Sequence, residues 1–461
     1  MHPTRTISKL LVIVIALFAV FSAMPAGASI TIEDEKKLGR EFYEKLLKSQ
    51  VLIEDNKING YVGKVGRRIL ESTEKAVFDF HFFVIRSKAI NAFATPGGYV
   101  YVNQGLVTLV ENESELAAVL AHEIAHVNSR HIADIVNKSQ KLNLAALAAM
   151  LAGAFLGGGG DMTAAVAGFS MAAATSLNLK YSREHEEEAD RLGIMYLVNA
   201  GYDGRSMLEL LKLMRRYEFY SNTIPSYFLT HPGTDERIAY CDALVQTGFA
   251  RAGAEAVIGR FKRIQTLLLL ESDDIDSNLK HFQEGVEKNP NDVDDLYGLA
   301  VTEARLGLTP QALEHFQRAL HSAPDDVDIL KDLGITCFLG GKAAQAVTYL
   351  EKASSLTEDS EESLLYLGRS YYAGGDYAAA LRTFRQLEKK KPDDPEIRYH
   401  LAMAYGKTNN PGESHYNFGL YFKKKHRFDS ARFHFQIALK HYPKDGEKYR
   451  QIQNELDRMK R

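Results

Sequence analysis

The spacing of apolar residues changes along the chain. From residue 30 to about residue 72, apolar side chains recur every three or four positions, which predicts helices with one buried face. In residues 77–85 apolar side chains occupy every second position, which is typical of a strand with one buried face. Residues 91–103, divided by a Pro-Gly-Gly turn at 96–98, predict a strand, a turn and a second strand. The first half is therefore expected to combine helices with a small sheet.

The second half repeats its apolar pattern every 34 residues. The pattern of 296–324 recurs at 330–353 and at 364–392, and a further unit ends at Pro443. This period is typical of tetratricopeptide repeats, whose helix pairs stack because one pair cannot bury its apolar face alone. An additional helix at about Glu396–Lys407 interrupts the register. We expect a mainly α chain that ends in an α-solenoid, with a concave surface for recognising another protein or the first half of this chain.

A predicted helix in the first half carries two histidines four residues apart, His122 and His126. Asn112 and Glu115 are expected to form a capping box at its start. The spacing places both imidazoles on one face of the helix, so they can bind one metal ion with Glu123 beside them. This His-Glu-x-x-His pattern is typical of zinc hydrolases, which need a third protein ligand and an open position for water.

The third ligand is expected further along the chain. The metzincin pattern requires glycine at 129 and histidine at 132, but the chain has Ser129 and Ile132, and His131 is one residue out of register. That class is therefore excluded. Within an acidic run, Glu186 and Asp190 are four residues apart and share a helix face. One of these carboxylates can bind the metal while the other orients a ligand histidine.

Taken together and in order, these motifs resemble the HtpX and BepA family of gluzincin metallopeptidases. The resemblance covers about residues 33 to 250 and rests on these motifs: Asn91-Ala92-Phe93-Ala94, Pro96-Gly97-Gly98, His122-Glu123-x-x-His126, Asn128-Ser129-Arg130-His131, Glu186-x-x-x-Asp190 within the segment that ends at Gly193, and Thr230-His231-Pro232 with Arg237-Ile238. It implies a gluzincin-type metalloprotease domain made of helices and a small sheet.

The resemblance also implies roles for the motif residues. His122, His126 and Glu186 would bind one zinc ion per chain, Glu123 would act as the general base, and Asp190 would orient a ligand histidine.

Two residues near the end of the resemblance receive further roles. In the BepA-like periplasmic members, the histidine of the Thr-His-Pro motif also reaches the metal, which here is His231, and Arg237 follows six residues later. A histidine on the metal would have to move before substrate enters. His231 or Arg237 could also stabilise the oxyanion of the reaction. The alternative is a structural loop at the start of a helix.

The strand before the metal helix is a candidate substrate site. Gly98, Tyr99, Val100 and Tyr101 could form an open edge to which an extended peptide adds by main-chain hydrogen bonds. A plain structural hairpin is the equal alternative.

The first residues of the chain predict export. Arg5 and Lys9 precede the apolar run Leu10–Phe21, and small residues follow it, so residues 1–28 are expected to be a cleaved signal peptide. An uncleaved anchor is the alternative, but the run is short for a membrane span of about 20 residues. Export would place a bacterial protein in the periplasm. The predicted domains are then a metalloprotease domain at 29–250 and a repeat domain at 251–461.

One internal stretch carries almost no charge. Residues 142–177 contain Asp161 as their one charged residue and four glycines at 157–160. A buried helix pair over the site, a mobile lid or membrane-contacting surface, and a transmembrane hairpin are the three interpretations. Neither arm supplies about 20 strongly apolar residues, which disfavours the hairpin.

Composition narrows the function classes further. The chain of 461 residues is 45% hydrophobic and 25% charged, as globular proteins are, and its net charge of -3 gives no reason to expect a nucleic-acid partner. Cys241 and Cys337 fit no Cys-x-x-Cys pattern. We expect buried thiols, with an inter-domain disulfide as the alternative.

These observations support three hypotheses. The first is an exported zinc endopeptidase that acts on misfolded or stalled envelope proteins in outer-membrane protein quality control and assembly. The second is a chaperone-like assembly factor whose repeats bind outer-membrane proteins or their assembly machinery, with proteolysis minor or gated. The third is an exopeptidase that trims short peptides.

Overall fold

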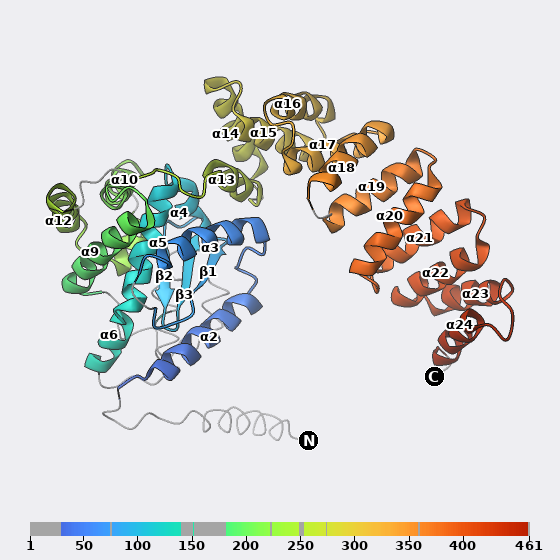
Figure 1. Cartoon of the computed structure of the whole chain (residues 1–461), viewed down its shortest axis with the longest axis horizontal. Helices are drawn as coiled ribbons and strands as arrows, with labels where there is room; N and C mark the ends of the chain where they lie inside the picture. Colours follow the sequence, from blue (N-terminus) through green and yellow to red (C-terminus); the bar gives the residue numbers. More distant parts are fainter. Residues whose placement is uncertain are drawn as a thin grey trace, which may run out of the picture. The chain divides into compact units, whose positions relative to one another are not determined.

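The computed structural model describes residues 29–73, 76–139, 151, 181–221, 224–248, 253–272, 274–357 and 360–459 (Figure 1). The predicted signal peptide lies outside these residues, and so does the low-charge stretch 142–177 apart from Leu151. Among the helices that are described, none is both long enough and apolar enough to cross a membrane. The chain divides into two compact units, Met1–Leu269 and Leu270–Arg461.

The first unit contains the small sheet that the sequence predicts. Its strands are β1 (His81–Ile85), β2 (Ala92–Thr95) and β3 (Tyr99–Asn103), in the order β1-β3-β2. β1 runs parallel to β3, and β2 runs antiparallel to it. The turn between β2 and β3 requires glycine, because Gly97 and Gly98 have φ values of 87° and 93°. The predicted strand–turn–strand is confirmed.

The prediction of an open edge at Gly98–Tyr101 is wrong. β3 is the central strand and pairs with a neighbour on each side. The carbonyl of Gly98 is also occupied, since it accepts a hydrogen bond from the His81 amide at 2.9 Å. Within the described residues, the outer strands are β1 and β2, so β2 is the outer strand of the hairpin.

Helices surround this sheet and contribute to two apolar clusters. They are α2 (Ile32–Lys48), α3 (Asn56–Leu70), α4 (Gln104–Leu109), α5 (Glu113–Asn128), α6 (His131–Ser139), α9 (Arg183–Ala200), α10 (Ser206–Ser221), α11 (Ser226–Thr230), α12 (Thr234–Thr247) and α13 (Phe261–Leu270). α5 is buried along nearly its whole length and packs against α9. Gly193 allows this approach, because a Cβ there would lie 3.3 Å from the His122 amide nitrogen and 2.9 Å from Met207 Cε.

The start of α5 is fixed by hydrogen bonds. At its start, the Asn112 side chain accepts from the Glu115 amide at 2.9 Å, which is one of the two hydrogen bonds of the predicted capping box. The Glu115 carboxylate accepts from the amide of Glu111 at 2.7 Å. Glu113, in the first turn, is a buried carboxylate that accepts five hydrogen bonds, from Tyr61, Tyr202, Val257, Ile258 and Gly259. These contacts anchor the metal helix before its histidines begin.

The second unit is built of helices that stack in chain order. They are α14 (Ile275–Lys288), α15 (Val293–Arg305), α16 (Thr309–Ser322), α17 (Val327–Leu339), α18 (Ala343–Leu356), α19 (Glu361–Ala373), α20 (Tyr377–Lys390), α21 (Pro395–Lys407), α22 (Pro411–Lys424), α23 (Phe428–Leu439) and α24 (Glu447–Arg458). α21 is the predicted additional helix, and it packs between α20 and α22. The mainly α fold with a small sheet is confirmed.

Recurring glycines explain why the repeat helices pack closely. A Cβ at Gly368 would lie 2.5 Å from the ring of Phe384, and one at Gly419 would lie 2.5 Å from the ring of Phe435. Each glycine thus leaves room for an aromatic ring of the next helix.

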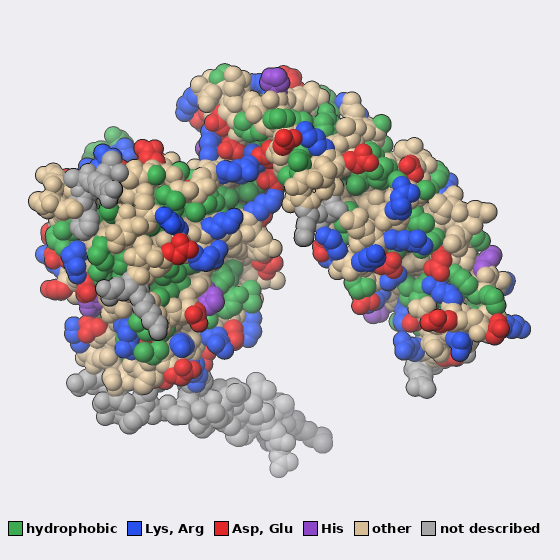
Figure 2. All heavy atoms as spheres, in the orientation of Figure 1, with side chains coloured by type: hydrophobic (Ala, Val, Ile, Leu, Met, Phe, Trp, Pro, Cys, Tyr) green, Lys and Arg blue, Asp and Glu red, His purple; other side chains and the backbone are tan. Residues whose placement is uncertain are grey.

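The domain boundary at residue 250 stays a prediction. The compact units divide at Leu269, because Phe261, Ile264 and Leu268 of α13 belong to the core of the first unit. Both cysteines are buried, and neither forms a disulfide in the described part of the chain. On the face shown in Figure 2, acidic and basic side chains are interspersed over both units.

Candidate metal centre

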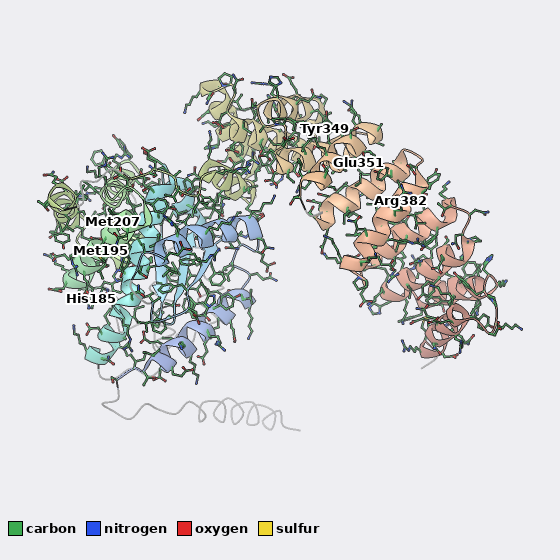
Figure 3. All side chains as sticks on the ribbon, in the orientation of Figure 1. His185, Met195, Met207, Tyr349, Glu351 and Arg382 are labelled. Atoms are coloured by element: carbon green, nitrogen blue, oxygen red, sulfur yellow. The ribbon has the colours of Figure 1, made fainter. Side chains whose placement is uncertain are left out.

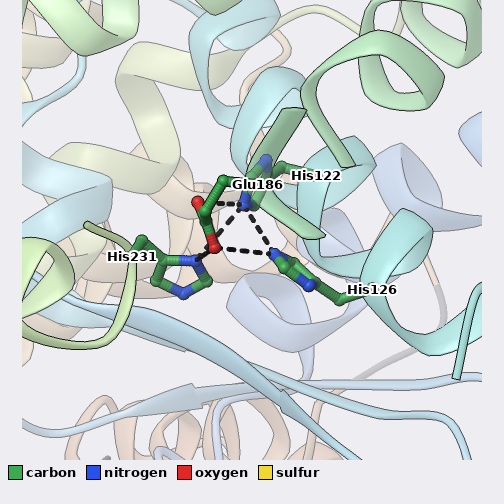
Figure 4. Close-up of side chains that lie close together, drawn as sticks. All are labelled: His122, His126, Glu186 and His231. Atoms are coloured by element: carbon green, nitrogen blue, oxygen red, sulfur yellow. Dashed lines mark hydrogen bonds and ion pairs between the residues drawn. The ribbon is translucent and has the colours of Figure 1, made fainter. Parts of the chain in front are cut away.

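Four buried side chains from three segments converge in the first unit. His122 and His126 come from α5, Glu186 comes from the first turn of α9, and His231 directly follows α11 (Figure 4). One potential ligand atom from each lies within 4.8 Å of the others. The structure thus brings together all four residues that the sequence suggested as metal ligands.

Four distances between these atoms are close to those in a tetrahedral metal site. His122 Nε2 lies 2.9 Å from His126 Nε2 and 3.3 Å from His231 Nδ1. Glu186 Oε1 lies 3.0 Å from His231 Nδ1 and 3.4 Å from His126 Nε2. Ligands about 2.0–2.1 Å from a tetrahedral zinc ion are about 3.3 Å apart, so the donor set and its spacing suit zinc.

The electrostatics of the ligands agree with this interpretation. Burial lowers the pKa of His126 well below its usual value, which keeps the ring neutral. Burial alone would raise the pKa of Glu186, but Arg237 and His231 outweigh it and hold this pKa well below the usual range. Neutral imidazole and ionised carboxylate are the forms that bind zinc. At His122, bonds to Asp190 and Glu186 outweigh burial and raise the pKa to about 9, so a metal ion must compete with a proton there.

Asp190 and Arg237 contact the ligand side chains through atoms that lie outside the cluster. Asp190 Oδ1 lies 2.9 Å from His122 Nδ1, which is the position expected of an orienting carboxylate. Arg237 donates from Nε and Nη2 to Asp190 at 2.8 and 2.7 Å, and its Nη1 lies 2.7 Å from Glu186 Oε2. Since its nitrogens are directed at these two carboxylates, the structure favours a positioning role for Arg237 over the catalytic role expected from the sequence.

Glu123 is placed differently from the other acidic residues. It is fully buried, and neither carboxylate oxygen has a hydrogen-bond partner among the described residues. His231 Nε2 lies 3.6 Å from Glu123 Oε1. Burial raises the pKa of Glu123. A buried, uncommitted carboxylate with a raised pKa is suited to accept and return a proton.

Two residues at the centre were missed by sequence reasoning. Tyr181 stacks on His126 with ring centroids 3.8 Å apart, and its buried hydroxyl has no hydrogen-bond partner in the part of the chain that is described. Its amide donates to the carbonyl of Thr230 at 3.2 Å, which fixes it beside His231. His131 contacts the other ring nitrogen of His126 at 2.8 Å. For Tyr181, its place directly before the helix cap Ser182 was the available signal.

A small recess adjoins the ligands on the side of the sheet. It is lined by Ala94, Thr95 and Pro96 at the end of β2, together with His126 and Tyr181. The outer strand of the hairpin therefore lies next to the ligand cluster.

Comparison with known families identifies both units. Residues 56–245 match the profile of peptidase family M48. Matches to tetratricopeptide-repeat profiles cover residues 267–327, 297–360 and 338–404. The chain therefore carries an M48 peptidase domain followed by tetratricopeptide repeats, which confirms the resemblance seen in the sequence.

Individual relatives support the same assignment. The beta-barrel assembly-enhancing protease of Yersinia pestis is 34% identical over 216 residues, which are 46% of this chain and 44% of that protein. A Vibrio cholerae protein of the same named kind is 36% identical over 247 residues, 51% of each chain. The mitochondrial metalloendopeptidase OMA1 of Schizosaccharomyces pombe is 29% identical over 212 residues, 45% of this chain and 60% of that protein. The chain spans about half the length of the bacterial relatives it matches.

Proposed function

We propose that this protein is a zinc-dependent endopeptidase. The observation that carries the proposal is the buried cluster of His122, His126, Glu186 and His231 beside an uncommitted Glu123 carboxylate. The M48 domain match and the metallopeptidase relatives support it.

The residues around the cluster have distinct parts in peptide hydrolysis. Zinc held by the cluster would act as a Lewis acid, polarising the scissile carbonyl and lowering the pKa of a water molecule. Glu123 accepts the proton of the attacking water and delivers it to the leaving amine. The Tyr181 hydroxyl is a candidate donor to the developing oxyanion, because it is buried beside His126 without another partner among the described residues.

His231 controls access in this proposal. Its Nδ1 occupies the fourth position of the cluster, where a hydrolase needs room for water and substrate. Its ring stacks on Tyr227 with centroids 4.2 Å apart, and its amide donates to the carbonyl of Tyr227 at 2.9 Å. Substrate entry therefore requires the segment that holds His231 to move away from the other three ligands.

Substrate binds along β2 rather than β3. β2 is an outer strand of the sheet among the described residues, and Ala94 to Pro96 line the recess next to His126. An extended peptide can add to such an edge by main-chain hydrogen bonds, which bind without strong sequence preference.

Replacing the proposed base tests this function. Glu123→Gln keeps the size of the side chain and the ligand cluster, so it should bind zinc like the wild type but lose cleavage of an unfolded protein by about 100-fold or more. Glu187→Gln is the matched control, because Glu187 is exposed on α9. Elemental analysis measures zinc binding and gel electrophoresis measures cleavage, so the effects of the substitution on binding and on catalysis are separated. Undiminished cleavage by Glu123→Gln contradicts the proposal.

The proposed cellular role is supported by the relatives and by the first residues of the chain. We place the protein in the periplasm, exported by residues 1–28, where it acts on misfolded or stalled envelope proteins during outer-membrane protein assembly. The names of the bacterial relatives support this role, and the repeats offer a surface for clients or for the assembly machinery. Peripheral membrane contact through residues 142–177 belongs to the same proposal.

A second candidate is an assembly factor whose proteolysis is minor. The closed cluster favours it, because His231 fills the position that substrate needs. Expression of Glu123→Gln in a deletion strain distinguishes the two: full rescue of outer-membrane assembly favours the assembly factor, and failed rescue with normal expression favours the peptidase. Mapping of cleavage sites on an unfolded protein addresses the exopeptidase, since internal cuts exclude it.

A further inference from the structure

His131 lies against the ring nitrogen of His126 that the ligand cluster does not use. His126 Nε2 faces His122 and Glu186 at 2.9 and 3.4 Å. His126 Nδ1 instead lies 2.8 Å from Nδ1 of His131, and the two rings meet edge-on with centroids 4.9 Å apart. His131 is buried as well. The sequence pattern excluded it as a metal ligand, and it does lie outside the cluster, but it contacts a ligand directly.

A sharp reversal of the backbone makes this contact. Arg130 follows the end of α5 with a left-handed φ of 54°, a conformation that costs energy in a residue other than glycine, and α6 begins at His131. The Arg130 guanidinium donates to Glu35 at 2.7 Å and to the carbonyl of Ile30 at 3.2 Å. The unfavourable conformation is thus held by contacts with the start of α2, and it returns His131 to the last turn of α5.

Metal binding would determine the direction of each hydrogen bond. An imidazole that binds a metal through Nε2 keeps its proton on Nδ1. His126 then donates from Nδ1, so Nδ1 of His131 must accept and its proton must be on Nε2. His131 Nε2 lies 3.4 Å from Glu188 Oε2, and an ionised carboxylate only accepts. The order of donors and acceptors is therefore consistent from the ligand to Glu188.

Neighbouring side chains fix His131 in this position. The ring of His185, labelled in Figure 3, stacks on it with centroids 4.4 Å apart and an interplanar angle of 18°. His185 itself contacts Asp134 of α6, with Nε2 to Oδ2 at 2.9 Å. Ser129 donates to Glu188 at 3.4 Å. These contacts join α6 to the first turns of α9, which also carry Glu186.

We propose that His131 and Glu188 form a hydrogen-bonded relay that fixes the ring orientation and tautomer of His126 for metal binding. Asp190 has the corresponding role at His122, where it contacts Nδ1 at 2.9 Å. The relay rests on the zinc centre proposed above. His131 and Glu188 are positioning residues, because they act through His126 and do not touch the substrate.

Zinc affinity of the full-length chain, measured by competition with a chelator, tests the relay. His131→Phe keeps an aromatic ring against His185 but removes the acceptor, so it should bind Zn²⁺ about 10- to 100-fold more weakly than the wild type. His131→Gln restores an acceptor oxygen and should recover most of this loss. Glu188→Gln keeps an acceptor oxygen but removes the negative charge, and its contact is longer, so it should cause a smaller loss. His81→Phe, an exposed histidine of β1, is the control and should bind like the wild type.

A second measurement distinguishes positioning from packing. The visible spectrum of the Co²⁺-substituted protein reports ligand geometry and should change in His131→Phe but return towards the wild type in His131→Gln. Equal losses in both variants would indicate that the ring shape matters, and would overturn the relay.

The remaining outcomes are also decisive. Wild-type affinity in both His131→Phe and Glu188→Gln overturns the proposal. If His131→Phe does not fold, Glu188→Gln decides alone, because Glu188 is half-exposed and its substitution leaves the core intact. A wild-type chain that binds no zinc would instead contradict the metal centre itself, so the two failures can be told apart.

Discussion

The repeat unit is built from neighbouring helices, whereas the metal centre joins residues that are distant in the sequence. In the repeats, each buried cluster draws on consecutive helices, as Phe384 does when it packs against Gly368. In the first unit, His122, Glu186 and His231 come from three separate segments and bury charge together. A substitution in one repeat should therefore disturb mainly the packing of that repeat, whereas the metal centre depends on the fold of the whole first unit.

The largest expected effect comes from breaking the buried charge network. Arg237→Ala leaves the carboxylates of Asp190 and Glu186 without their guanidinium partner and should destabilise the first unit by about 3–5 kcal/mol. Thermal unfolding followed by calorimetry measures this. Arg216→Ala is the control, because its ion pair with Glu111 is solvent-exposed and should matter little. A loss no larger than that of the control would contradict the role assigned to the network.

A crowding substitution in one repeat should have a smaller, local effect. At Gly368 even a Cβ would lie 2.5 Å from the Phe384 ring, so Gly368→Val should destabilise the second unit by about 1–3 kcal/mol. Zinc binding by the first unit should be unchanged. Gly60→Ala in α3 of the first unit, where a Cβ meets no atom within 4 Å, is the control for an uncrowded helix glycine and should not destabilise that unit. Loss of zinc binding in Gly368→Val would show that the units are not independent in this respect.

The smallest expected effect concerns the anchor of α5 and depends on pH. Burial alone would raise the pKa of Glu113, but hydrogen bonds from Ile258 and Tyr61 outweigh it and lower this pKa. Because the folded pKa is below the unfolded value of about 4.3, the stabilisation is present above that pH and is lost as pH falls through the folded pKa. Glu113→Gln should therefore cost about 1–2 kcal/mol at pH 7 and progressively less in acid. Urea unfolding across pH measures the difference, and a cost that grows in acid would exclude this account.

Sequence reasoning succeeded where spacing alone determines geometry. His122 and His126 share a helix face because four residues make about one turn, and the same holds for Glu186 and Asp190. It failed where the position of a strand in the sheet depends on pairing between distant segments. β3 became the central strand because β1 pairs with it from outside the hairpin.

The two missed residues have the same explanation. His131 reaches His126 through the left-handed conformation of Arg130, which no spacing rule indicates. Tyr181 is positioned by a backbone hydrogen bond to Thr230, far along the chain. Contacts of this kind depend on tertiary structure and leave no periodic pattern in the sequence.

The lack of a side chain at Gly193 determines how closely the two main helices of the metal centre pack. A single added carbon would meet the backbone of His122 at 3.3 Å, so the distance between α5 and α9 is set by a missing methyl group. Glu186 and His122 sit on the two helices whose separation this gap determines. The distance between these two ligands therefore depends on how closely the backbones of α5 and α9 approach. A larger residue at position 193 would move the helices apart and widen the metal site without changing any atom that binds the metal.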